Sequence, residues 1–201
     1  MNQPMPDESQ DAPDAFEQAE SKLFEDALCY MEVLPVQFKP QEFEESVTDQ
    51  ALDRAESLLR MMAQLEESYV EDTDDRANAD LHRIEAKLQL TLELIGALVA
   101  QSAPILPTHK VRWSRRGVSF EQSKTFTEGT TGLINLQPVP WLPHLLSLPC
   151  QVLASREGDG AFTLWLAFEP LPQSLETAIE RHLFRRHRRS IAASARRSTK
   201  S

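Results

Sequence analysis

The longest proline-free stretch of the chain limits its possible folds more than any other feature. Within it, the run from Thr48 to Gln101 is dominated by helix formers, and Pro104 must end it. Apolar residues recur at helical spacing in two arms. The first arm carries Leu52, Ala55, Leu59, Met62 and Tyr69, and the second carries Leu81, Ile84, Leu88, Thr91, Ile95 and Leu98. Residues 71–75 are acidic and poor in helix formers, so the pattern predicts two helices joined by a turn near residues 71–76.

The sequence on both sides of this stretch is typical of β-strands. Residues 31–38 place apolar side chains around Pro35, which predicts a strand with the proline at an edge position or a bulge. Beyond Pro107, strand candidates follow at residues 111–120, 133–136, 151–155 and 162–168. Residues 157–160 predict a hairpin turn. The prolines at positions 138, 140, 143 and 149 predict an irregular connection.

Both ends of the chain have their own character. Residues 1–19 are rich in Pro, Asp, Glu and Gln and lack apolar periodicity, so they are predicted to be a disordered acidic tail. A short helix is expected from Glu20 to Leu28. Near the other end, Ser174 is predicted to cap a final helix. Its buried face would be Leu175, Ile179 and Leu183.

The net charge of −10 conceals a strong asymmetry along the chain. Residues 1–80 hold 22 acidic and 5 basic residues, whereas residues 81–201 hold 9 acidic and 16 basic ones. From Arg181 to the end there are eight Lys or Arg residues and no acid. We expect this basic tail to contact an acidic surface, of this chain or of a partner. The acidic first half argues against a dedicated nucleic-acid binder, although binding through residues 185–189 is kept as an alternative.

Patterns that would indicate catalysis or a metal are absent from the sequence. It contains no Gly-rich phosphate loop, nucleophile elbow, HExxH or paired CxxC, and its five histidines form no metal-ligand pair. Cys29 and Cys150 are interpreted as small apolar residues in a reducing compartment. No signal peptide is recognisable, and residues 88–100 are too few to span a membrane. We therefore expect a cytoplasmic protein that is not an enzyme and needs no cofactor.

Residues 112–120, Arg-Trp-Ser-Arg-Arg-Gly-Val-Ser-Phe, carry the most specific signal. They resemble the second-strand motif of PilZ domains, (D/N)-hydrophobic-S-x-x-G followed by an apolar strand. Residues 33–38 are similar to the first strand of that family, residues 129–136 to its next strand pair, and residues 162–168 to its last strand before a terminal helix. The resemblance covers about residues 27–40 and 108–190. It implies an α+β fold, a six-stranded PilZ-like β-barrel with a helical insertion after the first strand and a C-terminal helix.

The resemblance divides the chain into four parts. Residues 1–19 are the tail, residues 20–40 the short helix and first strand, residues 41–107 the insertion, and residues 108–201 the rest of the barrel with its basic helix. If residues 31–39 and 109–120 are neighbouring strands, one continuous helix would separate the ends of the insertion by roughly 80 Å. An antiparallel helical hairpin is therefore predicted.

PilZ domains commonly bind the bacterial second messenger cyclic di-GMP, and the resemblance implies where such a site would lie. The matching positions are Arg112, Ser114, Arg115, Arg116 and Gly117. The RxxxR segment with which the family grips phosphate is missing, because residues 27–31 occupy its place. Arg112 stands where Asp or Asn belongs, and Gly117 is interpreted as a requirement of a backbone turn. Binding of cyclic di-GMP is not expected. The alternative is a receptor with a non-standard arginine set.

The second arm predicts self-association. It carries Leu90, Leu92, Leu94 and Val99 outside its main seam, and an arm that is apolar on several faces needs partners beyond its own hairpin. A tetramer is favoured over a dimer, with an interface formed by Leu81, Ile84, Leu88, Leu92, Ile95 and Leu98. The function predicted is that of a non-catalytic signalling adaptor that works through oligomerisation and contacts with a protein partner, which the sequence does not identify.

Overall fold

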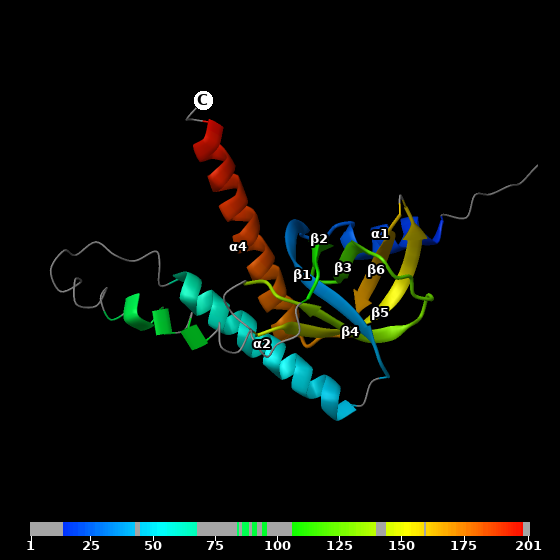
Figure 1. Cartoon of the computed structure of the whole chain (residues 1–201), viewed down its shortest axis with the longest axis horizontal. Helices are drawn as coiled ribbons and strands as arrows, with labels where there is room; N and C mark the ends of the chain where they lie inside the picture. Colours follow the sequence, from blue (N-terminus) through cyan, green and yellow to red (C-terminus); the bar gives the residue numbers. More distant parts are fainter. Residues whose placement is uncertain are drawn as a thin grey trace, which may run out of the picture.

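The computed structural model describes residues 14–42, 45–67, 84, 86–88, 90–91, 94–95, 106–139, 144–158 and 160–198. Its centre is a closed antiparallel barrel with the strand order β1-β2-β3-β6-β5-β4 (Figure 1). The strands are β1 (Tyr30–Pro40), β2 (Thr108–Trp113), β3 (Gly117–Gln122), β4 (Thr131–Leu136), β5 (Leu146–Glu157) and β6 (Phe162–Phe168). The predicted six-stranded barrel and α+β class are confirmed.

Pro35 lies where β1 changes neighbours rather than at a free edge. Residues 30–35 of β1 pair with β2, and residues 36–40 pair with β4. Because proline has no N–H group to donate, it fits the point at which one ladder ends and the next begins. Its carbonyl still accepts a hydrogen bond from the Gln137 N–H at 3.0 Å. The expected edge position is therefore replaced by a crossing point in a closed barrel.

Three strand predictions are corrected by the structure. Residues 111–120 form two antiparallel strands, β2 and β3, separated by a tight turn. Residues 129–136 contain one strand, β4, rather than a pair. Strand β5 is much longer than residues 151–155 and includes Pro149, which faces Leu133 of β4 instead of lying in an irregular connection. The predicted hairpin turn does join β5 to β6, where the Gly158 N–H donates to the Ala161 carbonyl at 2.8 Å.

Helix α4 (Gln173–Ser198) closes the core of the barrel. Leu175, Ile179 and Leu183 are fully buried, as predicted, among the inward side chains of the strands. The predicted Ser174 cap is wrong, because α4 has already begun at Gln173. The Ser174 hydroxyl instead donates to Glu56 at 2.8 Å, and the Pro172 carbonyl accepts from the backbone N–H groups of Leu175 and Glu176.

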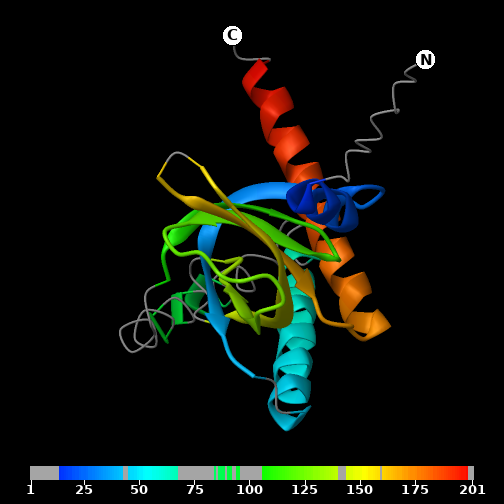
Figure 2. The ribbon, with the colours of Figure 1, turned by 90° about the vertical axis from the view of Figure 1, so that its right-hand side faces the viewer.

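Helix α1 (Ala15–Phe24) begins inside the segment predicted to be disordered and ends before Leu28. The Asp14 carboxylate accepts from the Ala15 N–H at 3.0 Å and caps the helix. Its apolar side packs against β5 and β6, where Ala19, Leu23 and Phe24 are buried with Trp165 (Figure 2). Phe16, Ala19 and Leu23 follow one another at helical spacing, so the side of this acidic helix that packs on Trp165 is apolar. Residues 1–13 lie outside the described residues.

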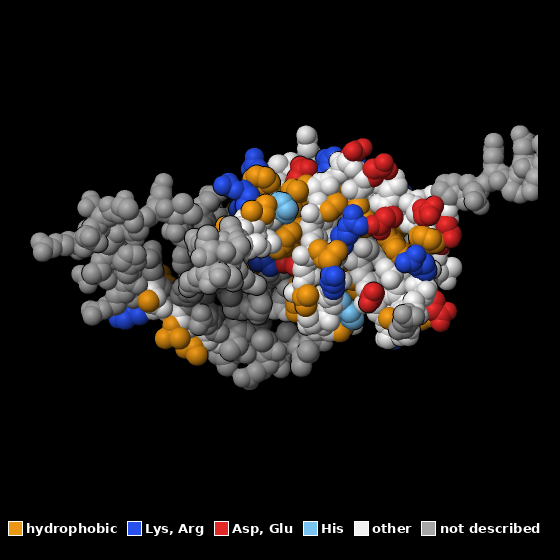
Figure 3. All heavy atoms as spheres, turned by 90° about the horizontal axis from the view of Figure 1, so that it is seen from above, with side chains coloured by type: hydrophobic (Ala, Val, Ile, Leu, Met, Phe, Trp, Pro, Cys, Tyr) orange, Lys and Arg blue, Asp and Glu red, His pale blue; other side chains and the backbone are white. Residues whose placement is uncertain are grey.

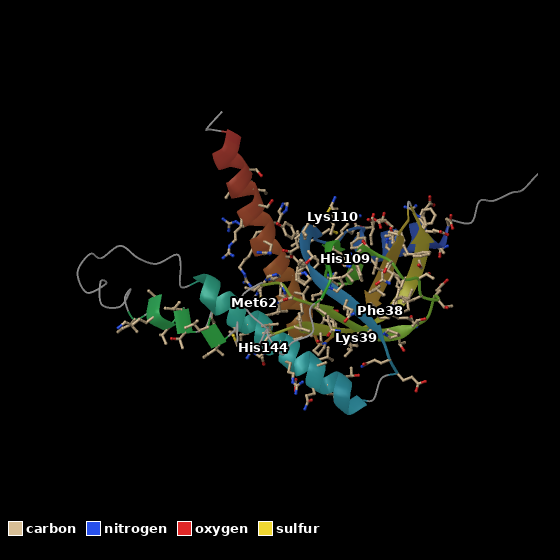
Figure 4. All side chains as sticks on the ribbon, in the orientation of Figure 1. Phe38, Lys39, Met62, His109, Lys110 and His144 are labelled. Atoms are coloured by element: carbon tan, nitrogen blue, oxygen red, sulfur yellow. The ribbon has the colours of Figure 1, made fainter. Side chains whose placement is uncertain are left out.

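Helix α2 (Glu45–Glu67) is the first arm of the insertion and begins three residues before Thr48. Ala55, Leu58, Leu59 and Met62 are buried, and α2 packs against β5 and α4. Figure 4 labels Met62 on this helix. In the second arm, residues 84, 86–88, 90–91 and 94–95 are helical. The turn predicted at residues 71–76 lies outside the described residues, so the antiparallel hairpin stays a prediction.

Candidate functional site

The turn between β2 and β3 carries the motif singled out in the sequence. Ser114 is fully buried, and its N–H donates to the Gly117 carbonyl at 2.9 Å to close the turn. The Ser114 hydroxyl donates to the Leu23 carbonyl at the end of α1 at 2.7 Å and accepts from the Arg116 N–H at 3.0 Å. Its only proton is therefore already used inside the protein.

Gly117 is required by close packing and not by the turn. The backbone φ of Gly117 is not in the positive, left-handed range that favours glycine. A Cβ atom at this position would lie 2.1 Å from the Leu166 carbonyl oxygen of β6 and 2.7 Å from Leu23 Cδ2 of α1. The expectation that a backbone turn demands this glycine is thus wrong in its reason. Only a glycine lets β3 approach β6 while α1 lies on top.

Two of the three arginines of the motif also contact α1 and the turn after it. Arg112 forms an ion pair with Glu20, and its guanidinium lies 4.2 Å from the centre of the Phe24 ring. Arg116 donates to the Glu25 carbonyl at 2.8 Å and to the Lys22 carbonyl at 3.3 Å. Glu20 accepts a second hydrogen bond, from Trp165 Nε1 at 2.6 Å. Arg115 is the loosest of the three, with Nε 3.9 Å from a Glu180 oxygen and both side chains well exposed.

The motif residues therefore come together, but they come together around α1. A shallow pocket of about 550 Å³ beside them is lined by Lys22, Arg115, Arg116, Glu169 and Glu176 among others. The two carboxylates offset its cations, so the pocket is not a concentrated site for a doubly charged anion.

Comparisons with known proteins agree with this barrel. Residues 59–197 match the family model described as "Atypical PilZ domain, cyclic di-GMP receptor". The chain belongs to the atypical PilZ family. A search of curated protein sequences found no match. The crystal structure of a pathogenic protein from Xanthomonas campestris, a PilZ domain described as tetrameric and self-assembled through an unusual helical bundle, has a TM-score of 0.75 to this chain. It is 41% identical over 88% of this chain and 97% of its own length.

Within this PilZ barrel, the place of the missing RxxxR segment is filled by the turn from α1 to β1. Asp26 adopts a positive φ of 53° there, and the Cys29 thiol contacts the Ala27 carbonyl at 3.2 Å. Tyr30 then enters β1 and packs against the core. None of residues 27–31 is Lys or Arg, so this turn offers no cation to bind a phosphate.

A polar cluster under α4 was missed by sequence reasoning. Glu32 of β1, whose side chain is only 7% exposed, accepts from Arg186 Nε at 3.0 Å and from Trp113 Nε1 at 3.2 Å. The ring of His182 lies 5.5 Å from that of Trp113, and neither of its ring nitrogens has a partner. Burial and the nearby arginines of α4 lower the pKa of His182 to about 3. The spacing of four residues between His182 and Arg186, on the side of α4 that also carries Leu183, was the available signal.

Three of the six residues of the predicted oligomer interface lie within the described residues. Ile84, Leu88 and Ile95 lie on described helical residues, and each is more than half exposed in the single chain. Leu90 and Leu94 are exposed to a similar degree. Leu81, Leu92 and Leu98 lie outside the described residues.

The remaining sequence expectations concern metals, membranes and the cysteines. Within the described ranges, no group of acidic, histidine or cysteine side chains could hold a metal ion, and no helix is long and apolar enough to cross a membrane. Cys150 is fully buried, and burial raises the pKa of its thiol well above the ordinary range. Cys29 is half-buried, and both thiols are free.

Proposed function

We propose that this PilZ protein is a non-catalytic signalling adaptor that does not bind cyclic di-GMP itself and acts as a tetramer through protein contacts. The observation that carries the first part is the hydrogen bond from the buried Ser114 hydroxyl to the Leu23 carbonyl. The motif's hydroxyl proton, and two of its three guanidinium groups, are satisfied by α1 and the turn that follows it.

A ligand at the motif would have to displace α1. Leu23 and Phe24 are buried, and exposing two such side chains costs about 2 kcal/mol each or more. Displacement would also leave Trp165 and Arg112 without their contacts on α1. The free energy of binding would have to offset these losses without the phosphate grip of an RxxxR segment.

Calorimetry with cyclic di-GMP tests this part of the proposal. We expect no saturable heat at micromolar concentrations of the full chain. A saturable isotherm that disappears in an Arg115→Ala/Arg116→Ala variant would establish the alternative, a receptor with a non-standard arginine set. An isotherm retained in that variant would place the ligand elsewhere and would equally contradict the proposal.

Self-association is supported by the exposed second arm and by the 41% identical neighbour described as tetrameric. Five large apolar side chains of the described part of that arm are between 51% and 59% exposed. Burying the exposed half of each contributes about 1 kcal/mol. Because these side chains occupy more than one face of the helix, a single partner helix leaves some of them in water, whereas a bundle covers them.

Analytical ultracentrifugation with matched variants tests the tetramer. Leu88→Asp/Ile95→Asp introduces two charges on the predicted seam and should dissociate the assembly, because unpaired charges are costly to bury. Ser123→Asp/Lys124→Asp introduces two carboxylates in the exposed loop after β3 of the barrel and should leave the tetramer intact. A wild-type chain that sediments as a monomer at micromolar concentration would disprove this part of the proposal.

A further inference from the structure

We infer that a hollow between α2 and α4 binds a small phosphate ester, a ligand with a dianionic phosphate group and a partly apolar body. The hollow has a volume of about 660 Å³ and lies where the two helices contact each other. Figure 1 shows α2 and α4 diverging from this contact toward their C-terminal ends. We call it the α2–α4 hollow, and its lining includes Glu56, Leu59 and Arg60 of α2 and Ala178, Arg181 and Arg185 of α4. The inference goes beyond the proposed adaptor function, because these residues belong neither to the PilZ motif nor to the predicted oligomer interface.

The formal charge of its lining distinguishes the α2–α4 hollow from two other hollows on the described surface. Its lining side chains include three arginines and one glutamate, a net charge of +2. The hollow beside α1 is lined by two arginines and three glutamates, a net of −1. The hollow beside the β2–β3 turn is lined by three cations and two glutamates, a net of +1. Since a concave site lined by one sign of charge concentrates ions of the other sign, the α2–α4 hollow is the best of the three for an anion.

The cations of the α2–α4 hollow come from both of its walls. Arg181 and Arg185 lie one turn apart on the same side of α4, a spacing at which like charges repel each other. No hydrogen bond or ion pair joins the exposed Arg181 to another residue that the structure describes. Arg60 lies on the α2 wall, and its side chain is 69% exposed. An anion between the walls would bind guanidinium groups of both helices and relieve the repulsion along α4.

Glu56, the acid of the α2–α4 hollow, already has two partners. Its carboxylate accepts from Arg60 at 2.6 Å and from the Ser174 hydroxyl at 2.8 Å, and its side chain is 26% exposed. The hydrogen bond to Ser174 joins α2 to the first turn of α4 and so fixes the two walls relative to each other. Arg60 uses one terminal nitrogen for Glu56, and its planar fork has further N–H groups for a ligand.

The shape and the walls of the hollow define the class of anion. A carboxylate can be satisfied by one guanidinium fork, whereas a phosphate has three terminal oxygens with which to bridge arginines on two walls. A volume of about 660 Å³ is typical of sites for small organic molecules and exceeds the needs of a bare phosphate ion. The buried Leu59 and the partly buried Ala178 provide an apolar surface for the rest of the ligand.

The charge distribution of the whole molecule favours the same site. From Arg181 onward the chain carries no acidic residue. Figure 3 shows the consequence from above: basic side chains gather over α4, whereas acidic side chains gather toward the end of the molecule that carries α1. A small anion is therefore attracted to the α4 end even though the chain has a net charge of −10.

Calorimetry on the full chain tests the site with AMP, at a pH above the second pKa of a phosphate, about 6. Adenosine is the uncharged control, inorganic phosphate lacks the organic part, and citrate carries only carboxylates. We expect saturable binding of AMP, weaker binding of phosphate and citrate, and none of adenosine. Arg60→Ala/Arg181→Ala should weaken AMP binding by on the order of tenfold or more, because it removes charged donors from both walls. AMP should also raise the thermal midpoint of the wild type more than that of this variant.

A matched variant controls for the loss of two positive charges. Arg54→Ala/Arg188→Ala removes one exposed arginine from each of the same two helices outside the lining of the hollow, and it should bind AMP like the wild type. The motif variant Arg115→Ala/Arg116→Ala should also bind AMP normally. Cyclic di-GMP calorimetry on these proteins keeps the two proposals separate, because either ligand can bind or fail to bind without the other.

Several outcomes would overturn the inference. Binding of neither AMP nor inorganic phosphate at millimolar concentrations would disprove the site. AMP binding that is equal in the wild type, the hollow variant and the matched variant would place the ligand elsewhere. Adenosine that binds as tightly as AMP, or citrate that binds more tightly, would contradict the phosphate class. Phosphate binding without AMP binding would show that the hollow excludes the organic part.

Discussion

His182 should make the stability of this PilZ barrel depend on pH in a predictable direction. The imidazole is buried between Trp113 and the core, and both ring nitrogens lack partners. Burial is the largest cause that lowers its pKa to about 3, and Arg186, Arg185 and Arg189 add to it. The folded protein therefore keeps His182 neutral, whereas the unfolded chain protonates it below about pH 6.5.

The magnitude follows from the two pKa values. Above pH 6.5 neither state binds the proton, so the difference between the two pKa values does not change the free energy of unfolding there. Below pH 6.5 the unfolded state gains a proton that the folded state refuses until about pH 3, so stability falls by about 1.4 kcal/mol per pH unit. At pH 5 the loss amounts to about 2 kcal/mol, a large part of the stability of a small domain.

The assay compares urea unfolding of the wild type and His182→Leu at a fixed protein concentration, because an oligomer's apparent stability depends on concentration. Leu has a similar volume and cannot titrate. Between pH 7.5 and pH 5, the free energy of unfolding of the wild type should therefore fall by about 2 kcal/mol more than that of the His182→Leu variant. NMR of the imidazole gives a second readout, with no titration expected in that range. A His182 resonance that titrates near pH 6.5 would refute the reasoning.

Three further changes have defined outcomes. Gly117→Ala should destabilise the fold by about 2 kcal/mol or more because its Cβ would overlap Leu166, whereas Gly158→Ala, with 3.6 Å to its nearest atom, should change the denaturation midpoint little. Glu32→Gln should cost about 1–3 kcal/mol, measured by urea unfolding, because it removes the charge that Arg186 binds under α4. Deleting residues 191–201 should leave thermal unfolding nearly unchanged, since the described side chains beyond position 190 are exposed.

The dispensable end of the chain begins near residue 191 in the structure, whereas the sequence suggests a uniform basic tail from Arg181. All residues from Arg181 onward look alike as a basic tail, and contact with an acidic surface was the expectation. The structure shows that Arg186 donates to the Glu32 carboxylate, whose side chain is buried under α4, and so helps to hold the helix on the barrel. Charge counts cannot distinguish an arginine that holds a helix in place from one that faces water, because the difference lies in which side of α4 each occupies.

The barrel itself could be predicted because its signals are local. Alternating apolar residues, prolines and a glycine-rich turn located most strands, and the resemblance supplied their order. The division of residues 111–120 into β2 and β3 was missed, because the turn at Ser114–Arg116 lacks proline and contains two arginines, which are equally common on the exposed side of a strand. Helix α1 was missed in part, since what orders it is Trp165, a residue about 145 positions later in the chain.

The ligand motif shows why surviving residues are weak evidence for a surviving function. Ser114 and Gly117 persist in this sequence, yet each has a structural task that needs no nucleotide. Ser114 ties the β2–β3 turn to the end of α1, and Gly117 lets β3 approach β6 beneath Leu23. Arg112, which replaces the family's acidic or amide residue, supports the same contact by binding Glu20 of α1. An Arg112→Asp variant would therefore place two carboxylates together and loosen α1, so restoring the family's residue should destabilise the protein without restoring binding.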